Sequence, residues 1–273
     1  MLNKINLFSN GIDLFQNNII PAGTFRKIAR VGLGALGIYA AIQARKYFQN
    51  TDNFINSVES IGEYLPTLVI KTHIAAGVDI NLRKDYESMS ALMRLARHNH
   101  IEGVRALINA GANINDEAYL PLFYGQTNAL LLAAGRGHAQ VVQALIDAGA
   151  DLNAKSNFDF TALMFAAMRG HAQVVRALID AEADLNAKSN KGFTALMFAA
   201  ERGHAQVVQA LIDAGADTNI EDKKGRKAET LANDNNIKTV IRRDHNARIR
   251  QQIGEQIGEC LIPDLQKIVL EYL

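Results

Sequence analysis

The sequence predicts an all-α fold, a solenoid of stacked helix-turn-helix units. The first observation is internal repetition, because the 33-residue segments 154–186 and 187–219 are the same except at six pairs of positions. The second is that each copy encodes two short apolar helices and a polar turn. A fixed period of this length is typical of units that bury their apolar faces only against a neighbour, and it argues against an enzyme. The six differing pairs are 158/191, 159/192, 168/201, 176/209, 182/215 and 185/218.

The first helix of each unit is expected to begin after a threonine, Thr161 in one copy and Thr194 in the next. A threonine hydroxyl can accept a hydrogen bond from the free N–H groups of a first helical turn. About two turns of apolar helix follow. Gly170 and Gly203 then end the helix, because glycine readily adopts the positive φ found at helix C-termini.

The second helix is predicted to begin at His171 in the first of these copies. Val174, Val175 and Leu178 belong to an apolar arc too wide to face water. In the next copy, Ala-Gly-Ala-Asp at 214–217 closes the helix, with the glycine in the left-handed conformation. The polar stretch 186–193 is expected to form a β-turn finger.

Two motifs resemble the signature of the ankyrin-repeat family. The family's T-P-L-H-x-A-A corresponds to 161–167 and 194–200, and its G-H-x-x-V-V-x-x-L-I-x-x-G-A-D-x-N matches 203–219 at every fixed position. Pro is replaced by Ala and the first His by Met in both copies, so the resemblance implies that the hydrogen bonds made by that His are lost. Glu182 stands where the left-handed Gly belongs, at a cost of about 1 kcal/mol.

The chain is expected to comprise a helical segment at 1–61, the repeat domain at 62–250 and an amphipathic helix at 251–273. The predicted repeats are about 82–115, 116–153, 154–186 and 187–219, between degenerate caps at 62–81 and 220–250. The second repeat is longer, because His100 and His138 lie 38 rather than 33 positions apart. In the last unit Arg243 and Asp244 replace internal Ala210 and Leu211, which suits a terminal capping repeat.

Composition narrows the choice of partner. The formal charge of +1 directs the chain to neither DNA nor RNA, and the single Cys260 fits a reducing compartment. The basic residues between 223 and 250 are expected to form a solvated end face, with an anionic contact as the alternative. His138, His171 and His204 recur with the repeat, but stacked helices lie about 9–10 Å apart and zinc needs ligands at about 2 Å. We therefore expect no metal and no cofactor.

The N-terminal segment contains an uncharged stretch at 31–44 with basic residues on both sides. It is shorter than the roughly 20 apolar residues of a spanning helix. Two interpretations stay open, a soluble helix that packs on the first repeat and a membrane-associated helix at 25–48. The G-x-G-x-x-G at 32–37 follows basic residues rather than a buried strand, so no dinucleotide site is expected.

The C-terminus carries apolar residues at 261, 265, 268, 269 and 272, which form one stripe of a helix. The stripe and its preceding Pro263 faintly resemble the first helix of F-box-like tails, which dock a ubiquitin-ligase adaptor. The alternative is a helix that caps the last repeat.

The resemblance implies a non-enzymatic scaffold that binds a partner protein through its finger tips and the concave face of its first helices. The long second finger carries several large apolar side chains, which would either anchor a partner or fill a small core of their own. Alternatives are an adaptor tethered to a membrane through 25–48 and one that recruits ubiquitin-ligase machinery through the C-terminal helix. The near-identical copies and unusual ends suit a bacterial or viral protein of eukaryote-like type, cytoplasmic or delivered into a host cell, with membrane association as the alternative. The predicted partner-binding residues are Arg97, His98, Tyr119, Phe123, Tyr124, Arg136, Asn157, Phe158, Phe160, Met168, Arg169, Asn190, Lys191, Phe193, Glu201 and Arg202.

Overall fold

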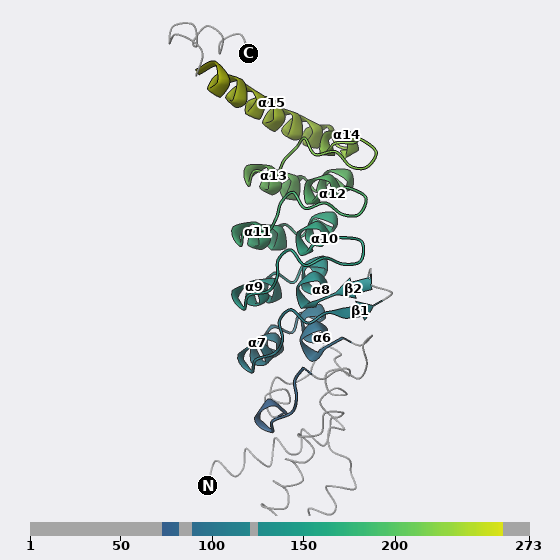
Figure 1. Cartoon of the computed structure of the whole chain (residues 1–273), viewed down its shortest axis with the longest axis vertical. Coiled ribbons are helices and arrows are strands. Elements are labelled where there is room, and N and C mark those ends of the chain that lie inside the picture. Colours follow the sequence, from purple (N-terminus) through teal and green to yellow (C-terminus); the bar gives the residue numbers. More distant parts are fainter. Residues whose placement is uncertain (1–72, 82–88, 121–124, 259–273) are drawn as a thin grey trace, which may run out of the picture.

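Two rows of antiparallel helices form an elongated stack in the computed structural model, which describes residues 73–81, 89–120 and 125–258 (Figure 1). The chain alternates between the rows, so each unit contributes one helix to each. The inner row contains α6 (Ala91–Arg97), α8 (Ala129–Arg136), α10 (Ala162–Arg169) and α12 (Ala195–Arg202). The outer row contains α7 (Ile101–Asn109), α9 (Ala139–Asp147), α11 (Ala172–Asp180) and α13 (Ala205–Asp213). The predicted all-α repeat stack is confirmed.

The expected helix boundaries are also confirmed. Thr161 Oγ1 accepts from Met164 N at 3.3 Å, and Thr194 caps α12 in the same way. The inner helices end at left-handed residues, with φ of 76° at Gly170 and 58° at Asn99. Asparagine adopts this conformation more readily than other residues with a Cβ, which explains its place in the first described unit.

The core runs along the whole stack. Inner helices are apolar on nearly every side, and α8, α10 and α12 each lie between two inner-row helices and an outer helix. Met164 and Met197, at the family's histidine position, are only 1% exposed and fill this core. Each outer helix buries a narrower stripe, such as Val174, Val175 and Leu178 in α11.

The recurring histidines at the start of the outer helices connect neighbouring units. His138 Nε2 donates to the carbonyl oxygen of Arg97 at 3.0 Å, and His204 Nε2 donates to that of Met168 at 3.2 Å. His171 bonds the backbone of Gly135, and burial lowers its pKa although this bond opposes the shift. Within the described ranges, no group of three His, Cys, Asp or Glu side chains is placed to hold a metal ion.

Asparagines at the end of each unit form a second set of links. Asn115 Oδ1 accepts from Asp151 N at 2.8 Å, and Asn153 Oδ1 accepts from Asp184 N at 3.0 Å. The bond recurs one unit later between Asn186 Oδ1 and a backbone N–H. These links satisfy backbone donors in the connecting loops and hold successive units at a fixed spacing.

The second finger and the last unit depart from the repeat. The long second finger is an antiparallel hairpin of β1 (Ala118–Leu120) and β2 (Gly125–Thr127), which projects from the inner-row side (Figure 1). The last unit has a short α14 (Ala228–Leu231) followed by α15 (Asn235–Gly258), which lies across the end of the stack. Ile237 and Ile241, on one side of α15, are buried. The helix continues through residue 250, where we expected the repeat domain to end.

No helix in the described ranges combines the length and apolar character needed to cross a membrane. The segment predicted at 25–48 lies outside these ranges. So do residues 259–273 of the predicted C-terminal helix.

Candidate protein-binding surface

Two neighbouring positions at the C-terminal end of each inner helix recur along the stack; in α6 the second of them, His98, is the residue that follows the helix. The first of them varies from unit to unit, with Arg97, Gly135, Met168 and Glu201 in order. The second position holds a histidine in the first unit and an arginine in the other three. We call its four members, His98, Arg136, Arg169 and Arg202, the basic column.

All four side chains of the basic column are exposed. The ion pairs found in the described ranges join Arg226 to Asp222, Arg242 to Glu229 and Arg248 to Asp244, so they include no member of the column. Burial lowers the pKa of His98, and the positive charges of Arg97 and Arg136 lower it further. His98 therefore loses its proton at a lower pH than an ordinary histidine.

Two predicted contact residues, Phe160 and Phe193, belong to a ladder of rings at the base of the fingers. Their centroids lie 5.1 Å and 5.0 Å from that of Phe198, and Phe160 also stacks on Phe165 at 5.3 Å. Phe193 is 7% exposed, with the guanidinium of Arg226 5.4 Å from its ring centroid. These positions give the two rings a packing role and leave little surface of Phe193 for a partner.

The finger tips are exposed and tied to one another. Phe158 is 46% exposed, and its carbonyl oxygen accepts from Asn190 N at 3.0 Å. One unit later the carbonyl oxygen of Lys191 accepts from Lys223 N at 3.1 Å. Each tip is therefore held by a backbone hydrogen bond to the next.

The hairpin joins the same row of tips. Asn157 Oδ1 accepts from Gln126 N on β2 at 3.0 Å, so the predicted contact residue Asn157 also links two fingers. Tyr119 on β1 is 39% exposed. Phe123 and Tyr124 lie outside the described ranges, and both interpretations of the long finger stay predictions.

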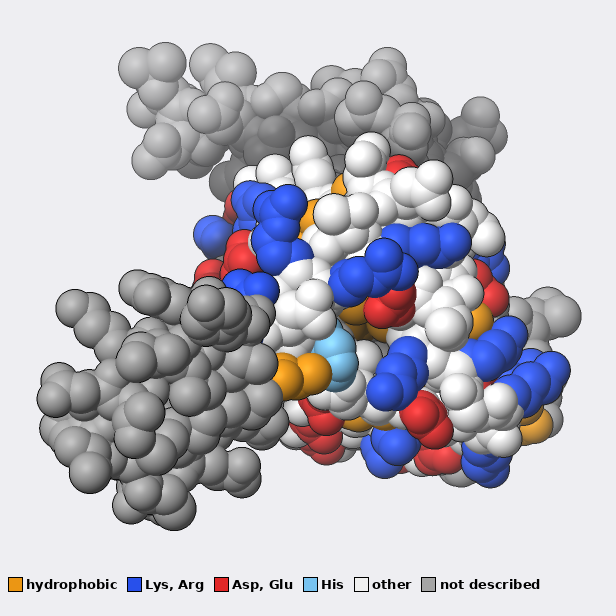
Figure 2. Space-filling view, turned by 90° about the horizontal axis from the view of Figure 1, so that it is seen from above, with side chains coloured by type: hydrophobic (Ala, Val, Ile, Leu, Met, Phe, Trp, Pro, Cys, Tyr) orange, Lys and Arg blue, Asp and Glu red, His pale blue; other side chains and the backbone are white. Residues whose placement is uncertain are grey.

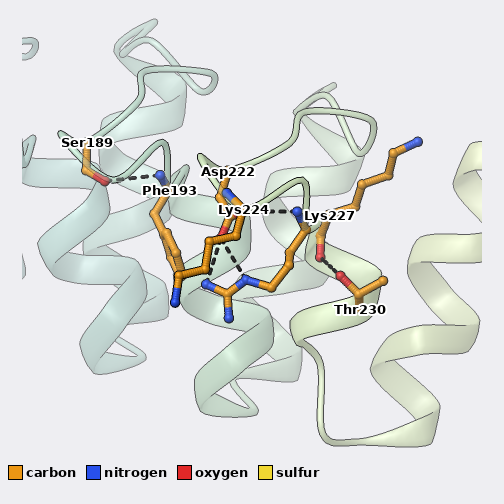
Figure 3. Close-up of polar contacts among 7 residues, drawn as sticks. Ser189, Phe193, Asp222, Lys224, Lys227 and Thr230 are labelled. Atoms are coloured by element: carbon orange, nitrogen blue, oxygen red, sulfur yellow. Dashed lines mark hydrogen bonds and ion pairs between the residues drawn. The ribbon is translucent and has the colours of Figure 1, made fainter.

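Three of the fingers turn around a buried polar residue, Ser156, Ser189 or Asp222. Figure 3 shows the last two. Ser189 Oγ accepts from Phe193 N at 3.1 Å. Asp222 Oδ1 accepts from Lys224 N at 2.8 Å and from Arg226 N at 2.9 Å. Its Oδ2 lies 2.7 Å from a terminal guanidinium nitrogen of Arg226.

Burial would raise the pKa of Asp222, but the hydrogen bonds from Arg226 and Lys224 and the charge of Arg226 lower it below the ordinary value. We did not expect this role. Aligning the three fingers would have revealed it, because Asp222 occupies the position of the two serines.

The outer side of α15 carries the basic end face (Figure 2). Thr239, Arg242, Arg243, Asn246, Ala247 and Arg250 line an open hollow of about 350 Å³. Acidic side chains lie among the basic ones in this view, and Arg242 pairs with Glu229 on α14. Mixed charges of this kind are typical of a solvated surface.

Comparison with known proteins agrees with the geometry of the stack. A family model described as ankyrin repeats (3 copies) matches residues 66–156 and 130–222, which together span more than half of the 273 residues. The chain belongs to the ankyrin-repeat family. Repeats of this family generally mediate protein–protein interaction and are typically not enzymes. A search of curated proteins found no match to this chain, and residues 251–273 lie outside the family match.

Proposed function

We propose that this chain is a non-enzymatic scaffold that binds a partner protein across its finger tips and the face of its inner row. The observation that carries the proposal is the row of linked tips, which presents Phe158 with nearly half of its surface exposed. Large exposed aromatic side chains are common anchors of protein interfaces. The phenylalanine ladder beneath the tips packs against the core.

The links between fingers favour binding for a second reason. A partner that docks on mobile loops must order them, and each ordered side chain costs about 0.5–1.5 kcal/mol. Here the backbone of each tip is already hydrogen-bonded to its neighbour. The surface is therefore preorganised.

The differences between the two near-identical copies also favour this surface as the binding site. Their differences include 158/191 at the finger tip and 168/201 at the inner-row face, whereas the buried helical residues are the same. Changes at these positions alter what a partner meets without altering the fold.

The copies also supply the test. The full chain would be used to capture proteins from a candidate host-cell lysate, alongside a Phe158→Lys, Met168→Glu variant that takes the residues of the next copy. Proteins that bind the tips and the inner row should be lost from this variant. The matched control is Arg176→Gln, which takes the next copy's residue on exposed α11 and should retain them.

Thermal midpoints close to that of the unchanged chain would verify that both variants are folded. If the double variant captures the same proteins as the unchanged chain, or if the control loses them equally, the proposed function is wrong.

A further inference from the structure

The basic column places a histidine and then three arginines at one structural position, while the residue at the adjacent position differs in every unit. Three of its four members are arginines, which stay charged at any ordinary pH. In the outer row, in contrast, one exposed position in the middle of each helix alternates between arginine and glutamine. Its residues are Arg105, Gln143, Arg176 and Gln209. The column is therefore the more uniform of the two charge patterns.

The spacing of the column follows from helix packing. Inner helices are direct neighbours along the stack (Figure 1), and packed helix axes lie about 8–10 Å apart. A guanidinium group is thus presented about every 8–10 Å along one line. A polyproline II chain has 3 residues per turn and rises about 3.1 Å per residue, so every third side chain faces the same way about 9 Å further on.

We propose that the basic column binds an acidic segment of the partner protein in the polyproline II conformation, with a carboxylate at every third residue. This inference rests on the proposed scaffold function and specifies the partner's chemistry. Each carboxylate would meet one guanidinium, whose planar fork of donors matches the two carboxylate oxygens. Unfolded chains already populate this conformation, so the segment would lose less conformational entropy on binding than one recruited into a helix.

The charges beside the column indicate which end binds more strongly. Arg94 and Arg97 add positive charge near His98, whereas Glu201 places a negative charge next to Arg202. Burial lowers the pKa of Arg97, and the charges of Arg136 and Arg94 lower it further. Glu201 opposes a carboxylate ligand at the Arg202 end, so the most acidic part of the segment should lie toward Arg136.

A carboxylate ligand fits better than a nucleic acid. The formal charge of the chain is only +1, and the column is a single line of well-separated cations. A nucleic-acid strand carries one phosphate about every 3.4 Å, about three for each arginine of the column.

The test uses fluorescent peptides and the full chain, with binding followed by anisotropy at low and moderate salt. The matched probe repeats Glu-Pro-Ala four times. The control probe has the same composition with its glutamates contiguous. The matched probe should bind several-fold more tightly, and its affinity should fall as salt increases.

Variants then locate the site. Arg136→Gln, Arg169→Gln and Arg202→Gln should each weaken binding of the matched probe about 2- to 5-fold. Arg105→Gln and Arg176→Gln remove the same charge from the outer row and introduce the glutamine of their own neighbours, so they should leave affinity unchanged. Glu201→Met, which takes the residue of the preceding copy, should strengthen it about 2-fold.

Equal binding of the two probes, no binding of either, or equal losses from the inner-row and outer-row variants would overturn the inference. So would tighter binding of a single-stranded oligonucleotide than of the matched probe. The capture experiment with Phe158→Lys and Met168→Glu is independent of these measurements. If capture depends on Phe158 and Met168 but the peptides do not bind as expected, only the proposed ligand of the column is wrong. If capture does not depend on these residues, the proposed scaffold function is wrong.

Discussion

The copies 154–186 and 187–219 form the same two helices from nearly the same residues, yet they differ in how they meet the left-handed backbone positions. The first copy has Asp159 and Glu182 at φ of 58° and 63°. The second has Gly192 and Gly215 at φ of 82° and 93° in the corresponding places. The stack therefore imposes the left-handed conformation whether or not glycine is present, because the neighbouring units fix the path of the chain.

The two glycines differ in their surroundings. A Cβ added to Gly192 would lie 2.9 Å from Lys223 N and 3.0 Å from Asp222 Cα, both atoms of the next finger's backbone. A Cβ added to Gly215 would meet nothing within 4 Å. Replacing glycine by a residue with a Cβ would therefore cause a steric clash at Gly192 in the finger. At Gly215, at the end of the outer helix, it would only place that residue in an unfavourable left-handed conformation.

The largest expected effect concerns the finger on which the second copy packs. Asp222→Ala removes the acceptor of two backbone donors and of the Arg226 side chain, and should destabilise the chain by about 3 kcal/mol. Asp222→Ser, which takes the residue of the two preceding fingers, should recover part of the loss. Urea unfolding measures both. A loss no greater than that of an exposed substitution would show that Asp222 does not hold this finger.

The same carboxylate predicts a dependence on pH. The pKa of Asp222 in the folded chain is below its ordinary value of 3.8, so the folded state binds fewer protons there than the unfolded state. Its stabilisation should be fully present above about pH 5, where the carboxyl is ionised in both states, and should decline as the pH falls through the folded pKa. The difference in unfolding free energy between the unchanged chain and Asp222→Ser should therefore narrow between about pH 5 and pH 2. A difference that stays constant over this range would contradict the assignment.

Exchanging the finger residues tests the steric part of the comparison. Gly192→Asp should destabilise the chain by about 2 kcal/mol, since the new Cβ meets backbone that cannot move without disturbing the next finger. The reverse exchange, Asp159→Gly, should change stability by less than about 1 kcal/mol in either direction. Urea midpoints of the two variants measure both stability changes. If Gly192→Asp costs no more than Asp159→Gly, the close approach at Gly192 has no steric cost.

The smallest effect is expected at the ends of the outer helices. Glu182→Gly should stabilise the chain by a few tenths to about 1 kcal/mol, and Gly215→Glu should destabilise it by a similar amount. Both sites are exposed, so only the backbone preference changes. A Glu182→Gly chain with an unchanged or lower urea midpoint would show that this preference does not limit stability.

Sequence alone determined the repeating architecture. Capping threonines, left-handed glycines and apolar stripes are local signals, and their recurrence at a fixed period shows that the units stack. Even the unusual position of Glu182 was predictable, because its counterpart in the next copy is glycine.

Only the tertiary structure decided what the finger residues contact. Phe193 and Asn157 were predicted as partner contacts from their positions, but the first packs in the ring ladder and the second holds the hairpin. The hairpin itself and the continuation of α15 past residue 250 were also not foreseen. The contacts of Asn157 with Gln126 and of Phe160 with Phe198 join residues about one repeat apart in sequence, so they form only when the units stack. A local pattern specifies each unit, whereas the contacts between units decide which side chains stay exposed to bind a partner.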